Sequence, residues 1–173
     1  MKTTTMTRIA LMAAVLCILA PISIPVPVSS VALTLATFVL YLMAYILKPR
    51  QVLTVVGIYL LLGAAGLPVF SGYMAGISRF AAPGGGYLIG YLFLAGISSW
   101  FVQKYSHLTL QISGMFLGTL VMYTLGTLWM ANTTGISFLS ALPAGMLVFL
   151  PLDILKIILA SYIGRKIRLY IKQ

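Results

Sequence analysis

Long apolar runs, separated by short polar or basic connections, make up nearly the whole chain. A membrane-spanning helix needs about 20 mostly apolar residues, with a range of about 17–25. We count six such runs, the third of them short, at residues 6–24, 31–47, 51–65, 84–102, 109–131 and 140–164. The pattern predicts an all-α integral membrane protein whose six transmembrane helices form a single domain over residues 1–173. The first run is interpreted as a spanning helix rather than a secretory signal, because no clear small-residue cleavage site follows it.

Two connections between the runs are rich in helix-breaking residues. Residues 21–30 contain three prolines, which exclude a regular helix there. Residues 63–86 are apolar but contain many glycines and two further prolines. Irregular backbone at membrane depth is tolerated only where it packs within protein or lines a cavity. We therefore expect residues 63–86 to fold back as a lid or wall over a pocket that opens outward. An exposed flexible linker is the alternative, which the apolar side chains disfavour.

The distribution of charged residues indicates how the predicted bundle is oriented across the membrane. Only 7% of the residues are charged, against about 25% in soluble domains. The net charge of +10 comes from basic residues that lie singly between apolar runs, unlike the clustered patch of a nucleic-acid-binding protein. With six spans, Arg79 falls on one side of the bilayer and Lys156 falls inside a span. The remaining basic residues fall on the other side: Lys2, Arg8, Lys48, Arg50, Lys104, Arg165, Lys166, Arg168 and Lys172. The positive-inside rule then predicts that both termini are cytoplasmic.

Few residues with catalytic or metal-binding chemistry are present. The sequence holds one cysteine (Cys17), one histidine (His107) and one acidic residue (Asp153). A single cysteine excludes an internal disulfide and a cysteine-based metal site. Because no nucleophile–base pair or metal-ligand set is visible, we expect neither an enzyme nor a metalloprotein.

Asp153 is the most informative residue, because it lies in the middle of the last apolar run. A charged group at the bilayer centre costs about 2.5–3.5 kcal/mol on insertion scales. Lys156 follows three residues later, so the two side chains share a helix face. Pro151 predicts a break that places Asp153 in the first turn of an inner helix, where the helix dipole favours a carboxylate. A ligand-binding pair is the favoured interpretation, and a structural ion pair that holds the bundle together is the alternative.

Two stretches of small residues point to close approach of the backbone. Residues Pro83–Tyr87 open the fourth run with consecutive glycines, which let a ligand or a neighbouring helix come near. Ala10 and Ala14 form a small-x-x-x-small pair on the first run, a pattern that allows helices to pack closely in membranes. Most of the tyrosines and both tryptophans are interpreted as interfacial belts.

Three stretches of the chain, in the same order and spacing, resemble the biotin-specific S-component family, BioY. They are Leu62-Gly-Ala-Ala-Gly-Leu-Pro-Val-Phe-Ser-Gly72, Pro83-Gly-Gly-Gly-Tyr-Leu-Ile-Gly90 and Leu150-Pro-Leu-Asp-Ile-Leu-Lys156. S-components are the substrate-binding subunits of energy-coupling-factor transporters in prokaryotes. The resemblance covers residues of about 8–165 and implies a six-helix S-component bundle in the cell membrane, with a biotin pocket on its outer side.

The resemblance also implies roles for individual residues. The family's last-helix motif places Asp153 and Lys156 in contact with biotin, and the alanine motif turns Ala10 and Ala14 toward a transmembrane coupling subunit. That subunit carries two cytoplasmic ATPases, so the chain needs no cofactor and ATP is consumed by its partners. The substrate-binding residues that we predict are Asp153, Lys156, Tyr87, Gly85, Gly86, Phe70 and Met74.

Several positions depart from the family pattern, and two of these departures leave room for other functions. Gly84 stands where the family has threonine in Gly-Pro-Thr-Gly-Gly-Tyr, and Ala36 stands where it has glutamine in Val-Pro-Ile-Thr-Leu-Gln. Both changes remove polar groups. An S-component for another small vitamin or precursor is therefore one alternative, and a stand-alone proton-coupled permease that uses Asp153 is another.

Overall fold

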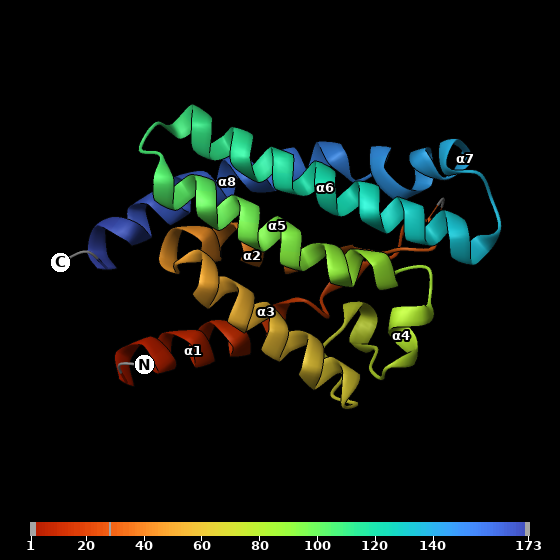
Figure 1. The fold of residues 1–173 in the computed structure, drawn as a ribbon, viewed down its shortest axis with the longest axis horizontal. Coiled ribbons are helices and arrows are strands. Elements are labelled where there is room, and N and C mark those ends of the chain that lie inside the picture. Colours follow the sequence, from red (N-terminus) through yellow and green to blue (C-terminus); the bar gives the residue numbers. More distant parts are fainter. Residues whose placement is uncertain (1–2, 28, 172–173) are drawn as a thin grey trace.

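The computed structural model describes residues 3–27 and 29–171, and helices dominate it (Figure 1). Lys2 and Lys172, two of the predicted topology determinants, lie outside the described residues. The helices are α1 (Thr3–Leu19), α2 (Ala36–Ile46), α3 (Pro49–Ala64), α4 (Ser78–Ala81), α5 (Gly85–Lys104), α6 (Leu108–Thr134), α7 (Phe138–Leu142) and α8 (Leu150–Ile171). A 3-10 turn (Ser71–Tyr73), a π-helical turn (Pro143–Leu147) and a two-stranded hairpin of β1 (Ser23–Ile24) and β2 (Leu33–Thr34) complete the elements.

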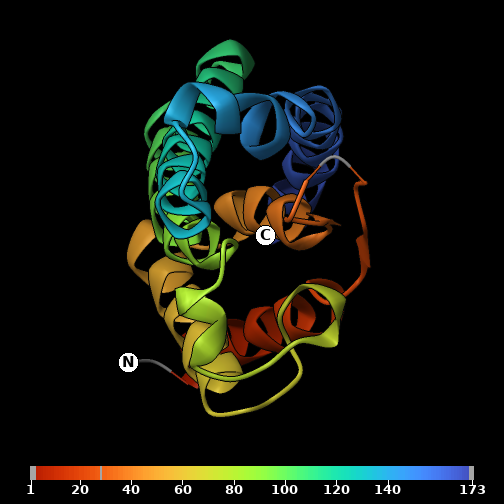
Figure 2. The ribbon, with the colours of Figure 1, turned by 90° about the vertical axis from the view of Figure 1, so that its right-hand side faces the viewer.

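Helix α2 runs through the middle of the molecule (Figure 2). Eight of its eleven residues are buried, because α8, α5, α1 and α3 pack around it and almost every face meets a neighbour. The residues of α2 are apolar nearly throughout, which is the composition expected of a helix buried on all sides.

Helices α5 and α6 pack closely because glycines stand at their contact. A Cβ added at Gly126 would lie 2.3 Å from the ring of Tyr87, and one added at Gly90 would lie 2.8 Å from the side chain of Met122. Small residues at such contacts let two backbones approach within a membrane. This contact fixes the position of the Tyr87 side chain.

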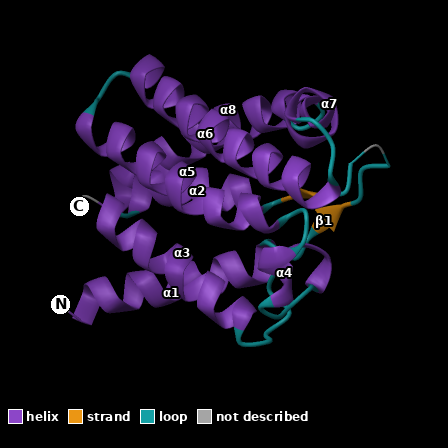
Figure 3. Ribbon diagram, turned by 45° about the vertical axis from the view of Figure 1, so that its right-hand side comes forward, coloured by secondary structure: helices purple, strands orange, loops and turns teal. Residues whose placement is uncertain are grey.

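The two ends of the bundle differ in structure. The first and last described residues lie at one end, and the irregular segments lie at the other (Figures 1 and 3). These irregular segments are the β1–β2 hairpin and residues 65–84, which contain the 3-10 turn and α4. The amide of Gly72 donates a hydrogen bond of 3.0 Å to the carbonyl of Pro21, and this bond ties the two segments together.

Three helical stretches are long and apolar enough to cross a membrane: Gly85–Lys104, Leu108–Thr134 and Phe138–Tyr170. The apolar helices α1, α2 and α3 are shorter. The last of these stretches, Phe138–Tyr170, has two local interruptions of its α-helical backbone. Backbone of the π type occupies Pro143–Leu147, and a turn at 148–149 precedes α8, so Asp153 lies in the first turn of α8.

Two predicted spans differ from the helices at their outer ends. The first predicted span, 6–24, includes Ser23 and Ile24, but α1 ends at Leu19 because Pro21 follows and has no N–H to donate. The second predicted span, 31–47, begins with extended backbone, and α2 starts only at Ala36. Hydropathy alone does not distinguish a short apolar strand from the first turn of a buried helix.

Candidate functional site

Three helices meet at the carboxylate of Asp153, which is only 1% exposed. Its Oδ1 accepts hydrogen bonds from Lys156 Nζ at 2.8 Å and from Thr37 Oγ1 on α2 at 3.0 Å. Its Oδ2 accepts a hydrogen bond from the hydroxyl of Tyr123 on α6. Hydrogen bonds from charged or polar donors are what makes a buried carboxylate tolerable in an apolar interior.

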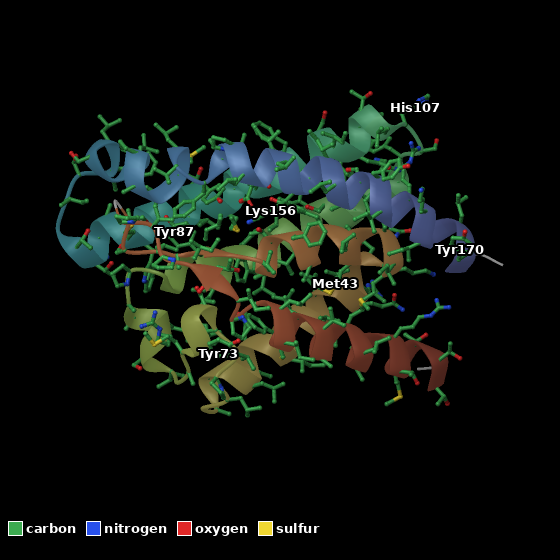
Figure 4. All side chains as sticks on the ribbon, turned by 180° about the vertical axis from the view of Figure 1, so that it is seen from behind. Met43, Tyr73, Tyr87, His107, Lys156 and Tyr170 are labelled. Carbon is green, nitrogen blue, oxygen red and sulfur yellow. The ribbon has the colours of Figure 1, made fainter. Side chains whose placement is uncertain are left out.

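The ammonium group of Lys156 is equally well bound. Besides the contact with Asp153, its Nζ donates to Thr37 Oγ1 at 3.0 Å and to the backbone carbonyl of Thr34 in β2 at 2.9 Å. An ammonium has three N–H donors, and these three contacts occupy all of them. Figure 4 shows Lys156 in the interior, between α8 and the central part of the bundle.

The ion pair therefore connects α8 to α2 and to the hairpin. Breaking a buried pair by removing one partner typically costs about 3–5 kcal/mol, because the other charge stays buried. The geometry serves the structural role that the sequence left open.

Two neighbouring cavities lead to this pair. The inner cavity has a volume of about 30 Å³, and Asp153 and Lys156 are among its lining residues. The outer cavity has a volume of about 370 Å³, within the range of about 300–1,000 Å³ that is typical of small-molecule sites. The two cavities share the lining residues Val31, Ala32, Thr34, Tyr87 and Tyr91.

The predicted substrate-binding residues distribute unevenly between these cavities. Asp153 and Lys156 line the inner one, Phe70 and Met74 line the outer one, and Tyr87 lines both. The Tyr87 hydroxyl donates a hydrogen bond of 2.7 Å to the carbonyl of Gly145, which holds α5 against the π-helical turn.

Gly85 and Gly86 do not belong to the residues that line either cavity in the described part of the chain. A Cβ at Gly85 would lie 1.9 Å from the carbonyl oxygen of Phe80, and a Cβ at Gly86 would lie 2.3 Å from Cβ of Trp129. Their place in the structure is thus one of close backbone packing at the start of α5.

The sequence analysis missed several residues that complete the site. Thr34, Thr37 and Tyr123 bind the ion pair directly, and Arg79 lines the outer cavity. The interpretation of the tyrosines as interfacial belts was wrong for these five, all of which are buried: Tyr41, Tyr45, Tyr59, Tyr91 and Tyr123. A hydroxyl inside an apolar span was the available signal, because a buried tyrosine hydroxyl usually finds a polar partner.

Ala10 and Ala14 line neither of these cavities. Both are exposed on α1, whereas Ala13 between them is buried against the neighbouring helices. The small-residue face of α1 therefore points away from the bundle.

Comparison with known proteins shows the family to which the chain belongs. A biotin transporter, BioY2, of Lactococcus lactis is 35% identical, with 94% of this chain and 89% of the relative aligned. A probable biotin transporter of Pyrococcus horikoshii is 34% identical over 97% of this chain and 98% of its own length. The crystal structure of the S-component for biotin from an energy-coupling-factor transporter matches with a TM-score of 0.90 and 30% identity, covering 99% of this chain and 93% of that one. The model of the BioY family matches residues 1–173, and the chain therefore belongs to this family of transport proteins.

Proposed function

We propose that the chain is the biotin-binding subunit of an energy-coupling-factor importer in a prokaryotic cell membrane. The observation that carries this proposal is the Asp153–Lys156 pair at the inner end of a cavity of suitable size, in a chain of the BioY family. The pair is the only acid–base pair the sequence can form within a span, since Asp153 is its only acidic side chain.

The chemistry of the two cavities suits biotin. The ureido ring offers two N–H donors to the Asp153 carboxylate and a carbonyl oxygen to the Lys156 ammonium. The apolar body of the ligand fits the side chains of Phe70 and Met74 in the outer cavity. Among the described residues, Arg79 is the one cation that lines this cavity, so the ligand carboxylate lies toward it.

Binding at the pair requires an exchange of hydrogen bonds. All three donors of Lys156 are occupied, one of them by the Thr34 carbonyl, and the inner cavity is too small for a ring. The ureido oxygen therefore takes the place of the Thr34 carbonyl, and the hairpin strand moves away from α8 to admit the ring.

Six crossings with both termini in the cytoplasm fit the proposal best. An eleven-residue helix such as α2 is about 17 Å long, short of the roughly 30 Å hydrocarbon core. The extended residues before α2 complete its crossing while packed inside the protein, where irregular backbone is tolerated. Uphill transport then uses two ATPases bound through a coupling subunit, and the chain itself carries no cofactor.

The test is a calorimetric titration of the detergent-purified protein with biotin. We expect Asp153→Asn to keep membrane insertion but to weaken biotin binding at least about tenfold, which equals about 1.4 kcal/mol. His107→Asn is the matched control, because His107 is exposed at the opposite end of the bundle from the hairpin (Figure 4). Unchanged affinity in Asp153→Asn would exclude its role in binding. A folded wild-type protein that binds dethiobiotin or lipoate in preference to biotin would assign a different ligand.

A further inference from the structure

A third cavity lies at the end of the bundle that holds the termini, far from the ion pair. Its volume is about 690 Å³, and Lys104, Arg165 and Arg168 are among its lining residues. Arg165 is twelve residues beyond Asp153 on α8, a distance of about 18 Å along the helix. Because Asp153 is the only acidic side chain of the sequence, these three cations have no carboxylate side chain as a partner.

The two arginines are held in place and still have donors available. Arg165 Nη2 donates to the carbonyl of Ser106 at 2.7 Å. Arg168 Nη1 donates to the carbonyl of Val102 at 2.9 Å, and its Nη2 donates to Gln103 Oε1 at 3.2 Å. A guanidinium has five N–H donors, so these bonds engage one donor of Arg165 and two of Arg168. Fixed guanidinium groups with remaining donors are well suited to a phosphate, which they bind with two parallel hydrogen bonds.

Two of the polar residues that line this cavity are hydrogen-bonded to backbone carbonyls. Gln103 donates to the carbonyls of Ala44 and Leu47 at the end of α2, at 3.0 and 3.3 Å. Gln111 is 2% exposed and donates to the Tyr105 carbonyl at 2.7 Å.

Aromatic side chains place this cavity at the depth of the lipid headgroups. The ammonium of Lys104 lies 4.4 Å from the centroid of the Trp100 ring and 5.4 Å from that of Tyr105. Trp100 is 45% exposed, and partly exposed tryptophans gather at the membrane–water interface.

An apolar groove begins next to this cavity and runs along the bundle. It has a volume of about 600 Å³ and lies between α6 and α8, lined by Ile112, Phe116, Ile154 and Ile158 among others. Ile154, Ile158 and Arg165 share one face of α8, because offsets of four and seven residues recur on the same side of a helix. Ile112 follows Gln111 directly on α6. The basic cavity and the apolar groove therefore lie next to each other, as the headgroup and an acyl chain of a lipid do.

We infer that the basic cavity and the adjoining groove form a binding site for an anionic phospholipid. The phosphate lies between Arg165, Arg168 and Lys104, and an acyl chain lies in the groove between α6 and α8. Basic pockets between transmembrane helices are known to hold acidic headgroups. The residues that line the basic cavity and the groove do not line either cavity at the ion pair, and the inference does not depend on which substrate the protein binds.

The test is native mass spectrometry of the purified protein with phosphatidylglycerol, phosphatidylcholine and inorganic phosphate. We expect phosphatidylglycerol to stay bound at least about tenfold more than phosphatidylcholine, and the double variant Arg165→Gln, Arg168→Gln to lose that preference. The matched control is Lys166→Gln, which removes the same kind of charge from the next position of α8. Lys166 is exposed and its ammonium lies over the Tyr162 ring, outside the cavity.

Three outcomes would overturn the inference. Equal retention of both lipids would exclude recognition of the acidic headgroup. An equal loss in Lys166→Gln would show diffuse attraction by charge rather than a site, and binding of inorganic phosphate that competes fully with the lipid would exclude a role for the groove. If the double variant fails to fold, Lys104→Gln replaces it, because the Lys104 ammonium contacts aromatic rings rather than the backbone that the arginines hold.

Discussion

Tyr123 supplies the hydrogen bond that satisfies the second oxygen of the Asp153 carboxylate. A hydrogen bond to a charged group contributes about 1.5–3 kcal/mol, and an unsatisfied buried charge costs at least as much. We therefore expect Tyr123→Phe to lower the melting temperature of the purified protein clearly. Tyr59→Phe is the control, since Tyr59 is also buried but packs edge-on against Phe70 with ring centroids 5.5 Å apart. Equal shifts in the two variants would mean that the Tyr123 contact adds nothing to stability.

At this scale the sequence singled out the ion pair of Asp153 and Lys156 but not the residues that hold it. Asp153 and Lys156 stood out because a charge inside an apolar run is costly and rare. Thr37 and Tyr123 reach the same carboxylate from positions 116 and 30 residues away in the chain. Contacts over such separations depend on how the helices pack, which the spacing of apolar residues does not reveal.

Among the helices, the α5–α6 contact depends on glycines that leave no room for a side chain. A Cβ at Gly126 would overlap the Tyr87 ring, whereas a Cβ at Gly57 on α3 has no atom within 4 Å. Overpacking costs about 1–3 kcal/mol, while alanine in place of glycine in a helix gains about 0.5–1 kcal/mol. Thermal unfolding should therefore show a destabilised Gly126→Ala and a neutral or stabilised Gly57→Ala. A neutral Gly126→Ala would indicate that Tyr87 can move aside.

The exposed small-residue face of α1 is not part of the α5–α6 contact and is the surface expected to meet a coupling subunit. If Ala10 and Ala14 meet a coupling subunit, Ala14→Trp should abolish biotin uptake by cells and leave biotin binding to the isolated subunit unchanged. Ala14→Ser keeps the side chain small and should transport normally, because close helix approach depends on size. Loss of binding in Ala14→Trp would show instead that the alanine supports the packing of the bundle itself.

The sequence predicted least well the segments in which apolar residues are extended rather than helical. The sequence predicted that Val31–Leu35 begins a span. In the structure Thr34 belongs to strand β2, and its backbone carbonyl accepts a hydrogen bond from Lys156. The run is apolar in either conformation, and only the pairing with Ser23–Ile24 selects the strand. By contrast, α5 and α6 lie close to their predicted limits, since long apolar runs with polar ends have few other ways to be accommodated.

The whole molecule has two ends of different chemistry, and this difference makes its orientation measurable. His107 and Tyr170 lie at the end with the termini, and Tyr73 lies toward the other end (Figure 4). Tyr73 and Tyr170 are 66% and 80% exposed, so cysteines placed there will be accessible to reagents. Most of the basic residues belong to the end with Tyr170, which the positive-inside rule assigns to the cytoplasm.

We therefore expect opposite labelling of Tyr73→Cys and Tyr170→Cys by a membrane-impermeant maleimide. In a Cys17→Ser background, intact cells should label Tyr73→Cys, and only permeabilised cells should label Tyr170→Cys. His107→Cys should behave like Tyr170→Cys, because six crossings place the α5–α6 connection and the C-terminal end of α8 on the same side. Labelling of His107→Cys in intact cells would contradict six crossings, since the connection would then face outward. Labelling of all three in intact cells would contradict the assignment of the basic end to the cytoplasm.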